Sequence, residues 1–228
     1  MSTTFQMISL PLPFRMGFVN VYLLKTPAGF FLVDSGSSSS RQLLIKELKK
    51  AGCQPGNLNL ILLTHGDFDH TGNAAYLRST YSCKIALHPA DAGMAEQGDM
   101  FANRQKPNFL IRQLIPVLSG FGKAERFSPD LSLSDGLDLN PYGLDARVIS
   151  IPGHSKGSIA VLTADGDMFC GDLLENIKTP MMNSIMDDPT AARASLKSIL
   201  KRKIRLFYPG HGQSFGLDEL IPNLPTDK

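Results

Sequence analysis

The sequence predicts an α/β fold, formed by one domain that covers residues 1–228. The length and the hydrophobic content of 43% fall within the range of a single compact α/β domain. Short apolar runs typical of strands alternate with helical patterns in both halves of the chain. No linker or low-complexity stretch separates the halves. We therefore expect one continuous core.

The start of the chain predicts antiparallel strands followed by a helix. Apolar runs separated by turn residues are typical of strands, which we expect over residues 5–10, 18–24 and 30–33. Ser37 to Ser40 provide candidate N-caps for residues 41–50, in which leucine and isoleucine recur at helical spacing. Gly52 is expected to end this helix.

The rest of the chain continues the alternation. Residues 59–63 predict a buried strand ending at Thr64 and His65, with a helix over residues 71–80 after it. The further expected strands cover residues 84–87, 146–151, 158–163, 168–170 and 204–208. The further expected helices cover residues 89–96 and 190–202. A loop between a strand and a helix often carries an active site, because rigid elements hold it.

Residues 97–125 form an apolar insertion that Pro107 and Pro116 interrupt, which predicts broken helix. It could be a connector packed on the core, a lid over the active site or a contact in a homodimer. Its basic residues are expected on a solvated face, with contact to an anionic substrate as the alternative; they are Arg104, Lys106 and Arg112.

Composition excludes several classes of partner. Lys and Arg number 23 against 21 Asp and Glu, so a net charge of +2 gives no footprint for nucleic acid or an anionic membrane. The N-terminal segment lacks a signal-peptide pattern, and no apolar run of about 18 residues occurs. We expect a cytoplasmic protein that acts on a small molecule. The three cysteines, which are widely spaced, are expected to be reduced core residues.

The segment after the strand over 59–63 carries the strongest chemical signal. His65, Asp67, Asp69 and His70 place four potential metal ligands within six residues. Two imidazoles and two carboxylates so close together would repel and desolvate one another unless a cation compensated them. The segment therefore predicts a metal site.

These residues resemble the metallo-beta-lactamase-fold superfamily. Its His-x-His-x-Asp-His motif is matched by His65, Asp69 and His70, and is broken at Asp67. Further signatures follow in the family's order, namely Pro152-Gly153-His154-Ser155, Gly171-Asp172 and Pro209-Gly210-His211-Gly212. Residues 20–23 and 33–36 look like the family's early strands. The resemblance spans almost the whole chain and implies a four-layered αββα sandwich of two mixed β-sheets flanked by helices.

The resemblance also implies a ligand set and a reaction. His65, Asp67 and His154 would hold one divalent metal ion, and Asp69, His70 and His211 would hold the other. Asp172 would bridge the two ions. The implied enzyme is a metal-dependent hydrolase that uses a hydroxide bound to the dinuclear centre to cleave an ester, lactone, thioester or related bond. Asp69 would act as the catalytic residue that orients the nucleophile and handles its proton.

Asp67 departs from the family motif and adds a third carboxylate. A less positive centre should acidify water less and favour iron or manganese over zinc. Flavodiiron proteins, a branch of the same superfamily, are similar in having a carboxylate at this position. Two alternatives stay open: Asp67 points away and only the second position fills, or zinc is bound regardless.

Two other functions stay open. The carboxylate at position 67 is compatible with a non-haem di-iron redox protein, although no flavodoxin-like domain or cysteine cluster is present to supply electrons. A complete ligand set is also compatible with a catalytically silent metal-binding module. Three further residues have expected roles: Asp34 as a brace for the metal loop, His88 as a hydrogen-bonded structural residue, and Lys156 as a solvated residue or a substrate contact.

Overall fold

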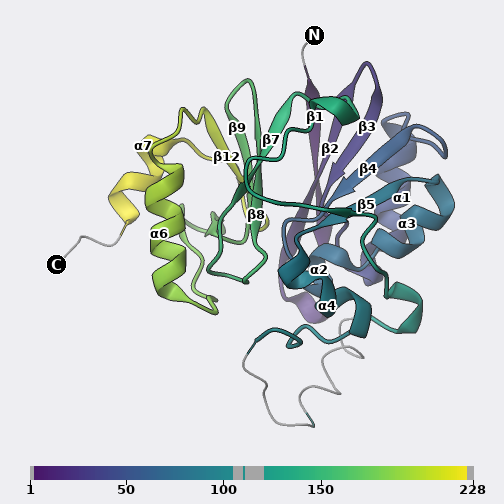
Figure 1. Ribbon diagram of the computed structural model, residues 1–228, viewed down its shortest axis with the longest axis horizontal. Coiled ribbons are helices and arrows are strands. Elements are labelled where there is room, and N and C mark those ends of the chain that lie inside the picture. The colour runs from purple at the N-terminus through teal and green to yellow at the C-terminus, as the bar shows by residue number, and fades with distance from the viewer. Residues whose placement is uncertain (1–2, 105–109, 111–120, 225–228) are drawn as a thin grey trace.

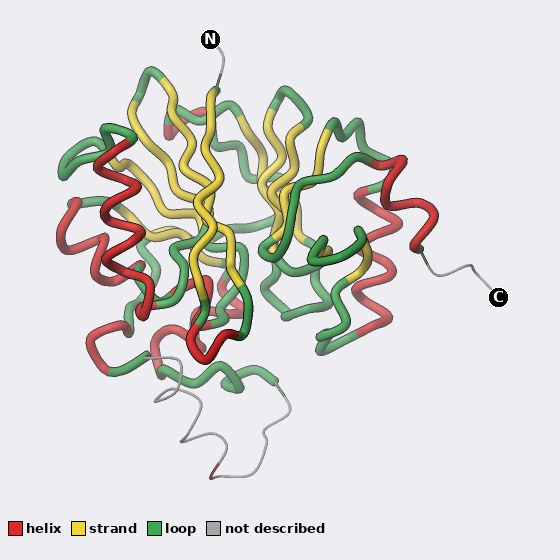
Figure 2. The backbone as a smooth tube through the Cα atoms, turned by 180° about the vertical axis from the view of Figure 1, so that it is seen from behind, coloured by secondary structure: helices red, strands yellow, loops and turns green. Residues whose placement is uncertain are grey.

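In the computed structural model, which describes residues 3–104, 110 and 121–224, two mixed sheets pack face to face with helices outside them (Figure 1). α1 and α3 cover one sheet, and α6 covers the other (Figure 1). Seen from behind, the strands lie between two outer sets of helices (Figure 2). The expected αββα sandwich is confirmed.

The first sheet has six strands in the order β1-β2-β3-β4-β5-β6. β1 to β3 pair antiparallel, and β3 to β6 pair parallel. The strands are β1 (Thr4–Pro11), β2 (Phe18–Thr26), β3 (Gly29–Val33), β4 (Leu58–Leu62), β5 (Lys84–Leu87) and β6 (Leu131–Ser132). The β2–β3 turn needs glycine, because Gly29 has a φ of +130° and a Cβ there would lie 2.8 Å from the Asn57 carbonyl oxygen.

The second sheet has four strands in the order β12-β9-β8-β7. β12 pairs parallel with β9, whereas the other pairs are antiparallel. The strands are β7 (Ala146–Ser150), β8 (Ile159–Thr163), β9 (Asp167–Gly171) and β12 (Leu206–Pro209). A separate two-stranded ribbon pairs β10 (Leu174–Glu175) with β11 (Met181–Met182).

The helices follow recognisable start signals. His88 caps α4 by accepting a hydrogen bond from the amide of Ala90, and Asp188 caps α6 by accepting from the amides of Thr190 and Ala191. The helices are α1 (Arg41–Lys50), α2 (Phe68–Thr71), α3 (Ala74–Tyr81), α4 (Pro89–Gln97), α6 (Pro189–Ile199) and α7 (Leu217–Leu220). Within the described residues, none is long and apolar enough to cross a membrane.

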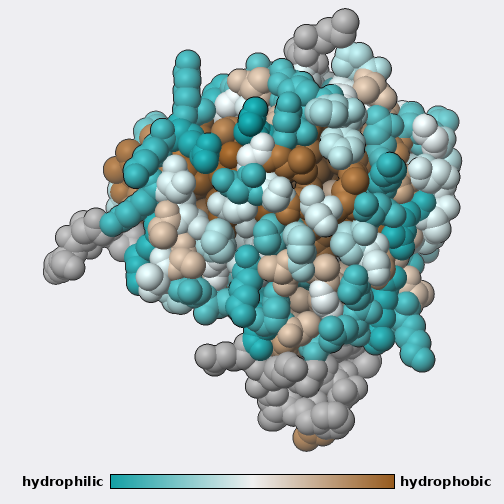
Figure 3. Space-filling model, viewed as in Figure 1, coloured by the Kyte–Doolittle hydropathy of each residue, from teal (hydrophilic) through white to brown (hydrophobic). Residues whose placement is uncertain are grey.

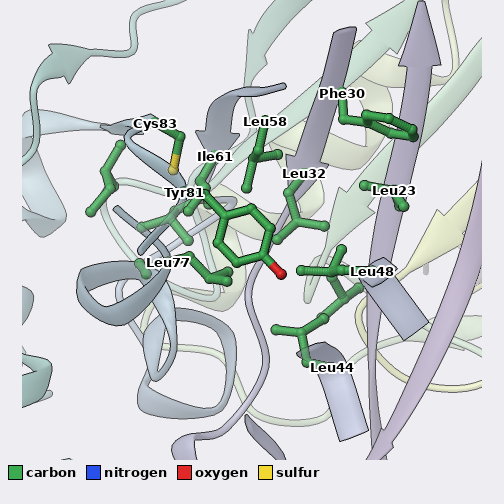
Figure 4. Close-up of a cluster of buried hydrophobic side chains, with 14 of the residues drawn as sticks. Leu23, Phe30, Leu32, Leu44, Leu48, Leu58, Ile61, Leu77, Tyr81 and Cys83 are labelled. Atoms are coloured by element: carbon green, nitrogen blue, oxygen red, sulfur yellow. The ribbon is translucent and has the colours of Figure 1, made fainter. Parts of the chain in front are cut away.

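Three apolar clusters hold the four layers together. Leu44 and Leu48 of α1 pack with Leu77 and Tyr81 of α3 against the first sheet (Figure 4). Tyr22, Phe31, Phe169 and Tyr208 belong to the cluster between the sheets. Ala192, Leu196 and Ile199 of α6 pack on the second sheet. Hydrophobic residues visible in Figure 3 gather over the strands, mostly set back beneath hydrophilic ones.

The structure differs from the sequence prediction in a few elements. The helix expected over residues 71–80 corresponds to α3, which begins at Ala74, and the separate helix α2 (Phe68–Thr71) precedes it. Gly72 separates them in a close contact, where a Cβ would lie 2.5 Å from the backbone nitrogen of Ser38. The short strands β6, β10 and β11 and the helix α7 were not predicted, since they are too short for a periodic pattern.

The insertion predicted over 97–125 is described only at its two ends and at residue 110. Residues 105–109 and 111–120 lie outside the described part of the chain, so the expected lid or dimer contact falls there. At the C-terminal end, Phe121 is buried and stacks on Phe68 of α2, with ring centroids 4.1 Å apart. The three cysteines are buried and free, as predicted.

Candidate metal centre

The structure brings all seven predicted ligands together at the ends of strands. His65 and Asp67 lie in the loop after β4, and Asp69 and His70 lie on α2. The other three follow β7, β9 and β12; they are His154, Asp172 and His211. The Gly210 amide joins the loops after β9 and β12 by donating to the carbonyl of Gly171 at 2.9 Å, and the Ile159 amide joins the two sheets by donating to the carbonyl of Thr64 at 2.8 Å. Strands from both sheets therefore present short side chains to one place.

Two groups of side chains have the spacing of a metal site. The ligand atoms of His65, His154 and Asp172 lie within 4.8 Å of one another, as do those of Asp69, His70 and His211. Asp172 lies near both groups: its Oδ2 is 3.9 Å from Nε2 of His154 and 3.3 Å from Nε2 of His211, and its Oδ1 is 3.4 Å from Nε2 of His70. Its position between the groups fits a bridging role.

Asp67 lies beside the first group. Its Oδ2 is 2.9 Å from Nε2 of His154 and 3.5 Å from Nε2 of His65. Its Oδ1 accepts a hydrogen bond from Arg104. Asp67 therefore does not point into solvent, and its side chain is 10% exposed.

Arg104 corrects one expectation from the sequence. A solvated face was expected, but the side chain is 8% exposed and also bonds to Asp187 and to the carbonyl of His154. The expectation was wrong because it weighed charge without the buried carboxylate partner, which only the fold places nearby. Lys106 and Arg112 lie outside the described residues.

Each of the four proposed histidine ligands uses Nδ1 for an outer contact and turns Nε2 towards the centre. Nδ1 of His65 lies 2.9 Å from Oγ1 of Thr64, and Nδ1 of His70 lies 2.9 Å from Oδ2 of Asp34. Nδ1 of His154 lies 2.7 Å from the carbonyl oxygen of Ile185, and Nδ1 of His211 lies 2.7 Å from the carbonyl oxygen of Phe18. Such contacts fix the tautomer and the ring orientation of a metal ligand.

Asp34 braces the loop, as predicted. It accepts hydrogen bonds from the amide of Thr64 at 2.8 Å and from its hydroxyl at 2.9 Å, besides meeting His70. His88, also as predicted, is a structural cap.

Asp91 and Gly210 support the centre, and the role of Asp91 was missed from the sequence. Asp91 is buried and accepts hydrogen bonds from the amides of Gly66 and Gly157 at 3.0 and 2.9 Å, so it ties two ligand loops together. A Cβ at Gly210 would lie 2.1 Å from Oδ1 of Asp172. Asp91 gives no sequence signal, because an acidic residue in the first turn of a helix is common. Gly210 was visible within the Pro-Gly-His signature.

The carboxylates give the centre a negative potential that favours a positive charge. Burial opposes a charge on the histidines, but Asp67 outweighs it at His154 and raises its pKa to about 9. Asp172 likewise raises the pKa of His211 to about 11. Burial would raise the pKa of Asp172 itself, yet His211 and His70 hold it well below its usual range. A bound cation would satisfy the same demand.

Unpartnered buried atoms test whether the residues fit a metal ion. Nε2 of His65, Nε2 of His70 and Oδ1 of Asp172 are buried and have no hydrogen-bond partner among the described residues. Such atoms are costly unless something binds them. Imidazole nitrogens and carboxylate oxygens are ligands for zinc, iron and manganese. The residues therefore fit a divalent metal ion.

A cavity lies beside the loop that carries His154, although none of the seven proposed ligands is among its described lining residues. Its volume is about 590 Å³, and its lining includes Arg104, Gly153, Lys156 and Asp187. This volume is in the range of small-molecule sites, which run from about 300 to 1,000 Å³. Lys156, for which solvation and substrate contact were both considered, is exposed and lines the cavity.

Comparison with known proteins agrees with this geometry. The family model of the metallo-beta-lactamase superfamily matches residues 15–211. The chain belongs to this superfamily, and its fold and site define a metal-dependent hydrolase.

Three relatives illustrate the range within the superfamily. The chain is 28% identical to Probable metallo-hydrolase YqjP of Bacillus subtilis, over 90% of this chain and 70% of that protein. It is 25% identical to Acyl-coenzyme A thioesterase MBLAC2 of Bos taurus, over 75% of this chain and 61% of that protein. The crystal structure of TTHA1623 in a di-iron-bound form matches with a TM-score of 0.69 and 29% identity, over 91% of this chain and 94% of that chain.

Proposed function

We propose that this protein binds two divalent metal ions and hydrolyses an acyl ester or thioester. The observation that carries the proposal is the convergence of three buried ligand atoms, on His65, His70 and Asp172, that have no hydrogen-bond partner among the described residues. The proposed first position is formed by His65, His154 and Asp67. The proposed second position is formed by Asp69, His70 and His211, with Asp172 shared between the two.

The chain's own residues set up the reaction. When bound, the two cations would lower the pKa of a water molecule and polarise the scissile carbonyl group. Asp69 is the most exposed carboxylate of the set, at 31%, so it can meet a water molecule that enters from solvent. In the proposed role it orients that water and accepts its proton. The buried histidines hold their orientation through the Nδ1 contacts.

Exposed apolar side chains around the centre support an acyl substrate. Phe18 and Ile185 are 59% and 71% exposed, and their carbonyls bond to His211 and His154. Ile177, 65% exposed, follows Asn176, whose amide donates to the carbonyl of His211. We call Phe18, Ile177 and Ile185 the apolar rim. Apolar groups exposed beside polar ligands suit a substrate with an apolar chain and a reactive carbonyl.

The metal ions are proposed to be iron or manganese, with zinc as the alternative. Oxygen ligands suit harder ions, and Asp67 offers oxygen where the family motif has imidazole nitrogen. The di-iron form of TTHA1623 supports iron as a candidate.

Metal analysis with a substrate panel tests the proposal. Purified protein is expected to hold two ions per chain, and removal by a chelator should abolish hydrolysis until metal is restored. The panel compares acyl thioesters of increasing chain length with esters and lactones. Hydrolysis that survives complete metal removal contradicts the proposal.

A di-iron redox protein is the second candidate, and it rests on the carboxylate of Asp67 beside two histidines. Reversible iron reduction with no hydrolysis across the panel would favour it. Two bound metal ions per chain, with neither hydrolysis nor reversible iron reduction, would favour a catalytically silent metal-binding module.

A further inference from the structure

The side chain of Arg104 lies directly behind the proposed first metal position. Its Nη1 donates to Oδ1 of Asp67, its Nη2 donates to the carbonyl of His154 at 3.2 Å, and its Nε donates to Asp187 at 2.6 Å. One guanidinium therefore contacts two of the residues proposed to bind the first ion. The family motif has no residue that predicts this contact.

The two oxygens of Asp67 face opposite partners. Oδ1 faces Arg104, whereas Oδ2 lies 2.9 Å from Nε2 of His154 and 3.5 Å from Nε2 of His65. Oδ2 is thus the oxygen that faces the proposed ligand atoms. A carboxylate held at one oxygen by an arginine has a fixed direction for the other.

We propose that Arg104 is a positioning residue for the first metal position: it directs Oδ2 of Asp67 at the metal ion and offsets the charge that this third carboxylate adds. The inference rests on the proposed metal centre. It extends that centre to a residue of the insertion which the superfamily motif does not include.

The charge balance supports this role. With neutral histidines, the three carboxylates Asp67, Asp69 and Asp172 carry a charge of −3, and Arg104 brings the sum to −2. A centre with histidine in place of Asp67 would have the same −2 without an arginine. Asp187 shares the guanidinium, but it is 31% exposed, so water screens its charge more than that of Asp67.

Asp67 and Arg104 therefore act together in place of a single neutral ligand. Removing Arg104 leaves Asp67 without the cation at its Oδ1, and removing Asp67 leaves Arg104 with only the more exposed Asp187 as its carboxylate partner, so each single change is costly. Replacing both should cost less than the two separate effects suggest. This non-additivity separates a charge-balancing pair from two independent residues.

The experiment measures metal affinity at both positions by competition with a chromogenic chelator, together with metal stoichiometry and thermal unfolding. Arg104→Gln is expected to weaken the first position by about tenfold to a hundredfold and to leave the second unchanged. Arg104→Lys keeps the charge but loses the fork, so it should weaken the first position less. Arg205→Gln removes an ion pair to Asp167 at β9 and is the matched control, with no expected change.

A second background makes the test specific. In Asp67→His protein, Arg104 no longer faces a carboxylate at position 67 and instead repels the nearby cation. Adding Arg104→Gln to this variant should therefore strengthen the first position, reversing the sign of the single substitution. A purely structural role for Arg104 predicts weakening in both backgrounds.

Each outcome decides the inference. Unchanged affinity in Arg104→Gln overturns it, and stronger affinity overturns it by showing that Arg104 competes with the metal ion for Asp67. If Arg104→Gln does not fold, Arg104→Lys decides, and unchanged affinity there overturns the inference. Wild-type protein that binds no metal overturns the proposed function as well. Wild-type protein with two ions, together with unaffected Arg104 variants, overturns only the role of Arg104.

Discussion

Oδ2 of Asp34 lies 2.9 Å from Nδ1 of His70, and this contact turns Nε2 of His70 towards Asp69 and Asp172. Asp34 sits just after β3 with a φ of +61°, a left-handed conformation that aspartate tolerates better than most residues. The same carboxylate holds Thr64 at the end of β4. One buried side chain therefore aligns two neighbouring strand ends with the metal centre.

Asp34→Ala should weaken both the fold and the metal site. It leaves the amide of Thr64 and Nδ1 of His70 without their acceptor, at an expected cost of about 2 kcal/mol or more in the free energy of unfolding. Loss of such an outer contact also lowers metal affinity by about tenfold to a hundredfold. Denaturant unfolding and metal titration measure the two effects. Normal metal affinity in a folded variant would contradict the bracing role.

His211→Ala should empty the second metal position and abolish hydrolysis while the fold persists. Its side chain is 15% exposed, and the apolar clusters do not include it. His70→Ala removes another proposed ligand of the same metal position. Because His70 is fully buried against Asp34, this variant should also have a lower unfolding temperature. Metal stoichiometry and thermal unfolding distinguish the two variants. Full activity in either would refute the ligand assignment.

Gly210→Ala should disturb the centre through one added methyl group. That Cβ would lie 2.1 Å from Oδ1 of Asp172 and 2.7 Å from Cε1 of His70, and hydrogen bonds to Asn20 and Gly171 prevent the backbone from moving away. We expect loss of metal with a folded chain. Gly93→Ala is the control, because its Cβ would meet only the end of Gln97 and, at 3.8 Å, Ala102. Equal metal content in both variants would argue against the close packing.

Metal affinity should rise with pH between about 6 and 8. In the metal-free protein, His154 and His211 have pKa values raised to about 9 and about 11, so both keep protons that a metal ion must displace. Their protonation also stabilises the metal-free fold fully below a pH of about 6.5, and this stability is lost as the pH rises through about 9 and beyond. Calorimetry in buffers of different ionisation enthalpy counts the released protons. A pH-independent affinity would count against these ligands.

Ile185→Ser should affect long acyl substrates more than short ones. The side chain is 71% exposed, and only its backbone carbonyl contacts His154, so the metal centre should stay intact. We expect KM to rise for long-chain thioesters, with little change for acetyl substrates and for metal content. Leu43→Ser on α1, 37% exposed, is a control away from the rim. An equal change in KM for acyl chains of all lengths would contradict a role for the apolar rim in substrate binding.

The sequence by itself predicted the proposed ligand set, whose members the structure brings together, and it determined most of the elements that carry them. Each proposed ligand follows an apolar strand within a short motif, and strand periodicity is a local property that a sequence displays directly. The αββα sandwich was implied by the resemblance of those motifs to the superfamily. The bracing role of Asp34 and a hydrogen-bonded structural role for His88 were also predicted, whereas the structure showed that His88 caps α4.

Only the tertiary structure decided which residues stand behind the ligands. Arg104 reaches Asp67 from 37 positions away, and Asp91 meets Ser155 from 64 positions away. No local pattern marks such pairs, because burial and an opposite charge arise only when distant loops pack together. From the sequence, a charged residue in an irregular segment is expected to lie in solvent. In the folded protein Arg104 is instead buried, because the fold places the carboxylate of Asp67 against it.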